Sequence, residues 1–183
     1  MKKLVCCIIL AISAAMSIVG LTDLSIINAQ EKMNEKYSKP NYNLTWLLGE
    51  PIYKELGRDD SSSVVLDDEG SIKTEDSYTA TGFLNGVGNV TDIAKFVTTY
   101  YPDDNTTSST GHGIIMTHDG EMATYAAQDL GVRDINGTET FRGIQIFQTD
   151  SGGKLEFIDN LIGLYEYKIW ADGKRTGMIW EWK

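Results

Sequence analysis

From Pro51 onward, hydrophobic and polar residues alternate with a period of two, and no long segment keeps the 3.6-residue period of an amphipathic helix. Clusters of Gly, Asn and Asp interrupt the alternation, and the 18 glycines are spread along the chain at turn-like intervals. This pattern is typical of strands joined by turns, and it predicts an all-β domain. We expect one helical turn within 154–161 and strands at 52–56, 63–66, 71–84, 91–101, 113–118, 121–132, 138–149, 163–170 and 175–182.

The final two strands are joined by an Asp-Gly pair at 172–173, which is a strong short-range signal of a hairpin. A two-residue loop there would pair Tyr167 with Met178 and Tyr165 with Trp180. That register collects aromatic and aliphatic side chains on one face of the hairpin, which we expect to be buried.

A second Asp-Gly pair, at 119–120, would pair Met116 with Ala123 and Ile114 with Tyr125. Neither face of this hairpin is cleanly polar, and strands of this kind suit a barrel or sandwich that is packed inside and partly covered outside. Eight or nine strands with short connections favour a single antiparallel up-and-down barrel of about eight strands over a two-sheet Greek key.

The first 29 residues have the organisation of a secretory signal. Lys2 and Lys3 precede an apolar run over 4–21, and Ala29 supplies the small residue before the cleavage point. An uncleaved membrane anchor is the alternative, because about 18 apolar residues are near the minimum for spanning a bilayer. The segment predicts an extracellular or cell-envelope protein, secreted or tethered to the membrane.

Residues 30–48 are polar, and we expect a flexible tether there, followed by the barrel domain at 49–183. Cys6 and Cys7 are the two cysteines of the chain. The domain that follows the signal therefore has neither a disulfide nor a thiolate metal site, and its core alone must stabilise it. About 150 residues are enough to do so.

The chain carries a formal charge of −10, which becomes −11 if Lys2, Lys3 and Asp23 are removed with the signal. The remaining basic residues are scattered, whereas phosphate contacts need clustered Lys and Arg. We expect no nucleic-acid partner, and contact with a membrane only through an uncleaved N-terminal segment. Glycosylation sequons, which matter only if the source cell glycosylates, begin at Asn43, Asn89, Asn105 and Asn136.

Four stretches carry a resemblance to a known group of proteins: Gly49–Glu55, Thr79–Gly86, Gly113–Tyr125 and Gly153–Lys183. They resemble uncharacterised secreted proteins of archaea and bacteria that are similar to the allene oxide cyclase-like and dirigent-like barrels. The similarity covers about 49–183 and implies a calycin-like, eight-stranded barrel with a central cavity. It is a pattern of strands and glycines without matching catalytic residues, so the cyclase's isomerase activity does not carry over.

Motifs for cofactors and metals are missing from the sequence. There is no phosphate-binding glycine loop, dinucleotide fingerprint or Gly-x-Ser-x-Gly elbow, and the acidic clusters lack calcium-loop spacing. His112 and His118 lie about 20 Å apart along a strand, too far to share a metal. We expect no cofactor and no metal, with His118 exposed and His112 exposed, structural or pointing into a cavity.

Two side chains are candidates for catalysis. Glu166 lies in the middle of a strand, and desolvation in a cavity would raise its pKa and make it a general acid or base. The alternative is an outward carboxylate paired with Lys168 or Arg175. Tyr125 is the second catalytic candidate. Side chains that would line a ligand pocket, or merely fill a core, are Tyr165, Tyr167, Trp180 and His112.

Three functions fit these observations. The leading hypothesis is an exported barrel without enzymatic activity that binds a small apolar ligand. The second is a cyclase- or isomerase-like enzyme that acts on a hydrophobic substrate. The third is a structural or adhesion subunit of the cell envelope, which the acidic surface and the tether permit.

Overall fold

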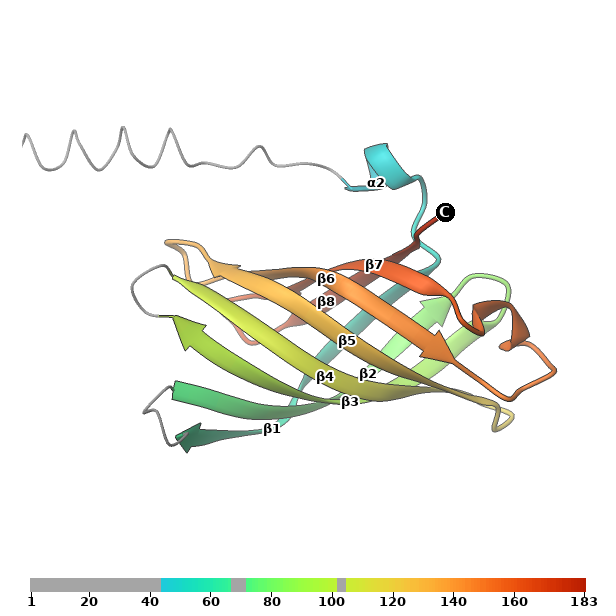
Figure 1. The fold of residues 1–183 in the computed structure, drawn as a ribbon, viewed down its shortest axis with the longest axis horizontal. Helices are drawn as coiled ribbons and strands as arrows, with labels where there is room; N and C mark the ends of the chain where they lie inside the picture. The colour runs from blue at the N-terminus through green and yellow to red at the C-terminus, as the bar shows by residue number, and fades with distance from the viewer. Residues whose placement is uncertain (1–43, 67–71, 102–104) are drawn as a thin grey trace, which may run out of the picture. The chain divides into compact units, whose positions relative to one another are not determined.

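The computed structural model describes residues 44–66, 72–101 and 105–183. Its strands form one closed antiparallel barrel in which each strand pairs with the next and the last pairs with the first (Figure 1). The predicted all-β, up-and-down barrel is confirmed. The elements are the α-helix α2 (Leu44–Leu48), the strands β1 (Tyr53–Leu66), β2 (Ile72–Leu84), β3 (Gly88–Tyr101), β4 (Thr106–Thr117), β5 (Met122–Arg133) and β6 (Glu139–Gln148), the 3₁₀-helix η2 (Glu156–Ile158), and the strands β7 (Ile162–Ile169) and β8 (Arg175–Glu181).

The nine predicted runs become eight strands because two of them belong to β1. The runs 52–56 and 63–66 cover the two ends of this strand, which has a bulge between Asp59 and Ser61. A bulge inserts one extra residue and shifts the alternation of side chains. The period-two pattern therefore breaks in the middle of β1. The helical turn predicted after β6 is confirmed as η2.

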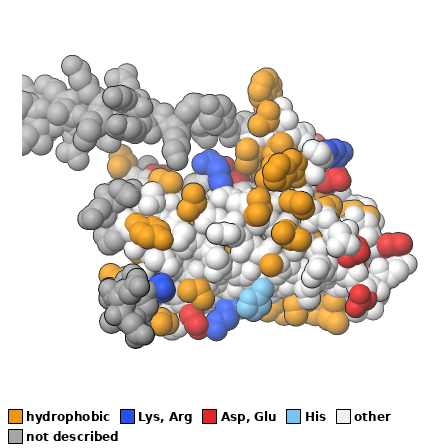
Figure 2. Space-filling view, in the orientation of Figure 1, with side chains coloured by type: hydrophobic (Ala, Val, Ile, Leu, Met, Phe, Trp, Pro, Cys, Tyr) orange, Lys and Arg blue, Asp and Glu red, His pale blue; other side chains and the backbone are white. Residues whose placement is uncertain are grey.

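Side chains alternate strictly between the inside and the outside of the barrel, as the pleat of a strand requires. In β5, Ala123 and Tyr125 are buried, while Met122 and Thr124 are exposed. The outer surface is mixed, with exposed hydrophobic side chains such as Ile114 among polar ones (Figure 2). The mixture explains why neither face of the predicted hairpins is cleanly polar in sequence.

The register of the β7–β8 hairpin is shifted by one residue from the predicted register. Tyr167 pairs with Gly177 rather than with Met178, and Tyr165 pairs with Ile179. The predicted pairing is wrong, and Tyr167 and Met178 lie on opposite faces of the sheet. A shift of one residue turns every side chain of one strand to the other face, but it leaves the order of the strands unchanged.

The cause of the shift is a loop that is one residue longer than predicted. The Trp170 N–H donates to the Lys174 carbonyl oxygen at 2.8 Å, and the Gly173 N–H donates to the Trp170 carbonyl oxygen at 2.8 Å. Residues 171–173 thus form a three-residue loop, and Gly173 at its end has φ of 80°. A type I turn followed by a left-handed glycine is the next most common hairpin connection after the two-residue loop.

The same loop recurs in two other hairpins. Residues 118–120 and 135–137 have the same hydrogen-bond pattern, and the glycines that end them have φ of 94° and 82°. The β4–β5 register is shifted in the same direction, so Ile114 lies opposite Thr124 rather than Tyr125. In these three hairpins, Asp-Gly or Asn-Gly supplies the second and third residues of a three-residue loop.

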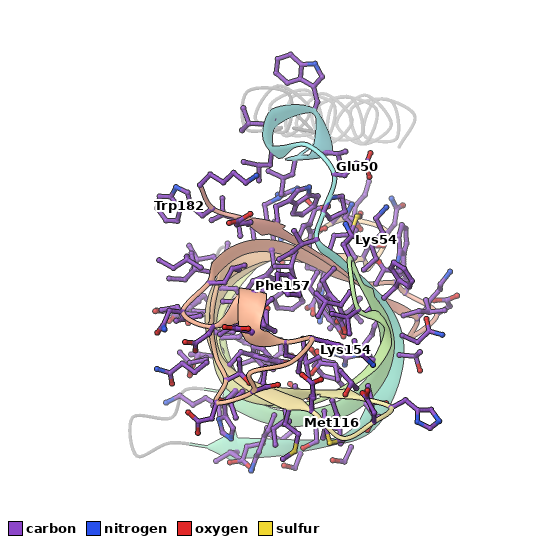
Figure 3. The ribbon with its side chains drawn as sticks, turned by 90° about the vertical axis from the view of Figure 1, so that its right-hand side faces the viewer. Glu50, Lys54, Met116, Lys154, Phe157 and Trp182 are labelled. Carbon is purple, nitrogen blue, oxygen red and sulfur yellow. The ribbon has the colours of Figure 1, made fainter. Side chains whose placement is uncertain are left out.

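The connection between β6 and β7 closes one end of the barrel. Seen from this end, η2 lies across the opening (Figure 3). Leu155 and Ile158 are 0 % and 1 % exposed and join the core cluster that contains Phe147. Their burial seals the end of the barrel with hydrophobic side chains, and we refer to Leu155 and Ile158 together as the plug.

A carboxylate from the β4–β5 turn holds the plug segment in place. Glu121 accepts hydrogen bonds from the Ser151 hydroxyl at 2.5 Å and from the backbone N–H groups of Lys154 and Leu155 at 3.0 and 3.1 Å. These donors lower the pKa of Glu121, led by the Ser151 hydroxyl. The carboxylate thereby satisfies backbone groups that have no partner in a strand.

The segment before β1 packs on the outside of the barrel. Trp180 is almost completely buried, and its indole N–H donates to the Gly49 carbonyl oxygen at 2.9 Å. Helix α2 lies at the end of the segment predicted as a tether, 30–48, whereas the predicted signal, 1–29, lies outside the described residues. None of the described helices is long and apolar enough to cross a membrane.

Candidate functional site

Beyond the plug, the inside of the barrel holds a cavity of about 240 Å³. Its lining is buried beside the plug, where Tyr53 is 1 % exposed, and half-buried further along, at Asp76 and Tyr100. The cavity is therefore more accessible from the end of the barrel opposite the plug. The tyrosines and the charged side chains that line it are Tyr53, Tyr78, Tyr100, Tyr125, Tyr165, Tyr167, Glu55, Asp76, Asp92, Asp129, Glu139, Glu166 and Arg175.

Glycines on neighbouring strands make room for two of the tyrosine rings. A side chain at Gly82 would overlap the ring of Tyr53, and a side chain at Gly113 would overlap the ring and hydroxyl of Tyr125. Both glycines face inward on the strand next to the tyrosine. The rings thus lie flat against the barrel wall, which leaves the centre open.

Two carboxyl groups meet in the cavity, each with a tyrosine hydroxyl. The Tyr53 hydroxyl donates to Glu55 Oε2 at 2.8 Å, and the Tyr125 hydroxyl donates to Asp92 Oδ1 at 3.0 Å. Glu55 and Asp92 lie close enough for each to affect the pKa of the other. Two neighbouring buried carboxyl groups disfavour each other's ionisation, so they titrate as a coupled pair.

Burial raises the pKa of both carboxyl groups of this pair. For Asp92, the neighbouring Glu55 charge raises the pKa further, well above the ordinary value, and outweighs the hydrogen bond from Tyr125. For Glu55, the hydrogen bonds from Tyr53 and Asp92 and the charge of Arg175 oppose the effect of burial. Ionisation of both carboxyl groups at once is therefore disfavoured.

A third carboxyl group lies on β5. The Tyr165 hydroxyl donates to Asp129 Oδ2, whereas Asp129 Oδ1 has no hydrogen-bond partner among the described residues. Asp129 is 6 % exposed, and burial raises its pKa, although Tyr165 and the nearby Ser109 act in the opposite direction. A buried carboxyl oxygen without a donor costs free energy, because it has lost its water.

Arg175 is the one basic residue in the lining of the cavity among the described residues. Its guanidinium lies 5.9 Å from the ring centre of Tyr78 and 6.0 Å from that of Tyr167, a cation–π arrangement. Burial lowers the pKa of Arg175 to about 10, against the opposing charge of Glu55. Arg175 is thus a cation at neutral pH, held between two aromatic walls.

Four of the predicted site residues line this cavity: Tyr125, Tyr165, Glu166 and Tyr167. Tyr125, Tyr165 and Tyr167 all point inward, the first two with their hydroxyls on carboxyl groups. The Tyr167 hydroxyl, in contrast, has no hydrogen-bond partner in the described part of the chain. The predicted pocket tyrosines therefore meet in one place, although the register that led to them was wrong.

The environment of Glu166 is mixed. It alternates with the inward tyrosines of β7, and Arg142 and Lys168 pair with it at 2.7 and 3.0 Å, as in the alternative that paired it with Lys168. Its side chain is nevertheless buried, and it is among the residues that line the cavity. Trp180 is covered by the segment before β1, and His112 is exposed on β4. Neither of these two residues lines the cavity.

The carboxyl groups of the cavity were missed, although the sequence carries a signal for them. Asp92 occupies a position in phase with Val90 and Ala94, and Asp129 occupies a position in phase with Tyr125 and Ala127. A charged residue in the hydrophobic phase of a strand is expected to be buried, and buried charge marks functional sites. The alternation of hydrophobic residues within β3 and within β5 is therefore sufficient to identify Asp92 and Asp129 as inward-facing.

The remaining candidates lie away from the cavity. Three of the four sequon asparagines, Asn89, Asn105 and Asn136, are exposed, and Asn43 lies outside the described residues. The described residues include no group of three or more His, Cys, Asp or Glu side chains arranged to hold a metal ion.

Comparisons with known proteins relate the fold, but not the site, to other molecules. No family model matches this sequence, and no curated protein matches it. A protein of unknown function from Clostridium acetobutylicum ATCC 824 has a similar structure, with a TM-score of 0.61 and 14 % identity over 73 % of this chain and 98 % of its own. A conserved protein of unknown function from Rhodopseudomonas palustris has a TM-score of 0.60 and 7 % identity over 72 % and 95 %. At these identities the similarity shows the fold alone.

Proposed function

We propose that this protein is an exported binding protein that holds one small molecule inside its barrel. The observation that carries the proposal is the open half of the barrel, which is lined by tyrosines and buried carboxyl groups. Export rests on the signal pattern of residues 1–29. The similarity to the allene oxide cyclase-like barrels supports a cavity at this place and nothing about its ligand.

A barrel selected only for stability would fill this space differently. Hydrophobic side chains at the positions of Asp92 and Asp129 would remove the desolvation cost of buried carboxyl groups. Tyr167 and Asp129 each leave a polar atom without a hydrogen-bond partner in the described structure, which costs further free energy. Departures from stable packing are expected at functional sites.

The size and chemistry of the cavity narrow the class of ligand. Its volume of about 240 Å³ lies below the range of roughly 300–1,000 Å³ that drug-sized ligands occupy. Aromatic rings form the walls, while carboxyl groups, hydroxyls and one guanidinium lie among them. A compact molecule with an aromatic or aliphatic body and a polar group fits this lining better than the wholly apolar ligand expected from the sequence.

Native mass spectrometry of the full-length protein, purified without denaturant, tests the proposal. We expect a bound species that is released by unfolding and that raises the melting temperature when it is added back. Two adjacent serines of β4 give a matched pair of variants. Ser109 lines the cavity, so Ser109→Phe should fill it and abolish binding, whereas Ser108→Phe on the outer face should bind as the unmodified protein does. Equal binding by both variants would contradict a site inside the barrel.

Acid–base catalysis in the same cavity is a second candidate, favoured by one observation. Glu55 and Asp92 form a coupled pair of carboxyl groups in the cavity beside the Tyr125 hydroxyl, and coupled carboxyl groups of this kind serve as acid and base in other enzymes. Tyr125 thus keeps the catalytic role predicted for it, while Asp92 replaces Glu166. The two candidates differ in the fate of the ligand. A binding protein returns it unchanged after incubation, whereas an enzyme returns a product of different retention time or mass.

A further inference from the structure

Carboxyl groups outnumber basic groups in the lining of the cavity. Glu55, Asp92 and Asp129 face it with a single basic residue of the described lining, Arg175, against them. Further along, Glu139 is paired with Arg133 at 2.5 Å, and Asp76 accepts a hydrogen bond from a threonine at 2.7 Å. The arrangement leaves more carboxyl groups than cations inside the barrel.

Asp129 keeps one carboxyl oxygen without a hydrogen-bond donor among the described residues. Its side chain is 6 % exposed, it lines the cavity, and its Oδ1 atom has no hydrogen-bond partner among the described residues. A carboxyl oxygen accepts hydrogen bonds, so the missing partner is a donor. A ligand with N–H groups would supply that donor, and a positively charged ligand would supply the missing charge as well.

The aromatic walls are also suited to a cation. Tyr78 and Tyr167 already place their ring faces about 6 Å from the guanidinium of Arg175. Clusters of aromatic rings beside carboxylates are a common solution for binding organic ammonium groups. The Tyr167 hydroxyl, which lacks a partner among the described residues, adds an acceptor in the same cavity.

From these observations we infer that the ligand of the barrel is a small organic amine, bound as its cation with its N–H groups at Asp129 and its body against the tyrosines. The inference rests on the proposed binding function and names its ligand class. An anionic ligand would face the carboxyl groups of Glu55, Asp92 and Asp129. Among the basic residues of the described lining, only Arg175 could attract it.

Three probes of similar shape and different charge test the ligand class: 2-phenylethylamine, 2-phenylethanol and 3-phenylpropionate. Calorimetric titration of the full-length protein at neutral pH should give an affinity for the amine at least about tenfold higher than for the alcohol, and no binding of the carboxylate. Charge-assisted hydrogen bonds account for a difference of this size.

Asp129→Asn should bring the amine to within about threefold of the alcohol, since the amide keeps an acceptor but loses the charge. Glu75→Gln is the matched control, because this carboxylate is 41 % exposed and does not line the cavity, and it should leave all three affinities unchanged. If Asp129→Asn does not fold, the probe series on the unmodified protein still decides the question.

Binding of the alcohol or the carboxylate as tightly as the amine would overturn the inference and leave the proposed binding function standing. Failure of all three probes to bind would also overturn it. The proposed function itself is decided separately, by the species that the purified protein carries in native mass spectrometry.

Discussion

The two ends of the barrel are filled by different kinds of side chain. At the plugged end, Leu155 and Ile158 fill the space between the strands and are 0 % and 1 % exposed. In the half beyond the plug, Asp92 and Asp129 occupy inward positions, and the interior keeps a cavity of about 240 Å³. The same eight strands enclose a dense hydrophobic core at one end and buried polar groups at the other.

This difference indicates that the plugged end stabilises the fold, whereas the polar half lowers its stability. Hydrophobic burial at the plug contributes roughly 25 cal/mol per Å² of apolar surface removed from water. Buried carboxyl groups act in the opposite direction, because desolvation raises their pKa and penalises the ionised form. The plug thus offsets the cost of the polar half, and substitutions at the two ends should change the stability in opposite directions.

Leu155→Ala at the plug should have the largest effect. Truncating a fully buried leucine removes hydrophobic burial and leaves a cavity, which costs about 2–5 kcal/mol of the free energy of unfolding. Chemical denaturation followed by circular dichroism measures it. Phe157→Ala is the matched control, since Phe157 lies two residues further along, in η2, but is 49 % exposed, and it should cost less than about 1 kcal/mol. Equal losses in the two variants would show that the plug is not a stabilising core.

The sequence predicts this difference between the two ends only where it shows which face of a strand points into the barrel. The barrel and the number of its strands follow from alternation and turn residues, which are local properties. The plug is predicted only as a helical turn within 154–161, because nothing in the sequence states that this turn folds back over the barrel end.

The register of the hairpins does not follow from the Asp-Gly pairs. Two-residue and three-residue loops both accept Asp-Gly, and they differ by the one residue that decides which side chains of the next strand point inward. On β8 both phases carry large hydrophobic residues, Met178 and Trp180 in one and Ile179 in the other. The hydrophobic pattern of β8 therefore cannot distinguish a two-residue loop from a three-residue loop. The prediction that Trp180 lines the pocket is wrong for this reason.

Glu166 and Asp92 show that the inward face of a strand must also be known before a charged residue can be placed. Both lie in the middle of strands, but Asp92 shares the phase of Val90 and Ala94, whereas Glu166 shares the phase of Leu164 and alternates with two tyrosines. Only the closed barrel shows that the tyrosine phase is the inner one on β7. For Asp92, in contrast, the hydrophobic residues on either side of it in β3 are enough to indicate an inward position.

Asp92→Asn, in the polar half, should act in the opposite direction to the plug variant. The folded-state pKa of Asp92 is raised, so folding binds its proton more tightly, and its contribution to stability falls as the pH rises from the ordinary carboxyl range through the raised value. The amide keeps an acceptor for the Tyr125 hydroxyl and cannot ionise. The variant should match the unmodified protein in acid and gain on the order of 1 kcal/mol at higher pH. Denaturation curves across pH measure the gain, and a variant that is less stable at every pH would contradict a strained carboxyl pair.

Glu75→Gln should have the smallest effect, because Glu75 is a partly exposed carboxylate that does not line the cavity. Glu75 and its partner Lys95 are 41 % and 49 % exposed, and ion pairs of this kind contribute about 0–1 kcal/mol. The amide oxygen can still accept from Lys95, so the loss should stay below about 1 kcal/mol, and ligand binding should not change. Denaturation and titration of this variant beside Asp92→Asn compare a carboxyl group outside the cavity with one inside it. A loss of binding in Glu75→Gln would mean that the outer surface of β2, rather than the cavity, carries the site.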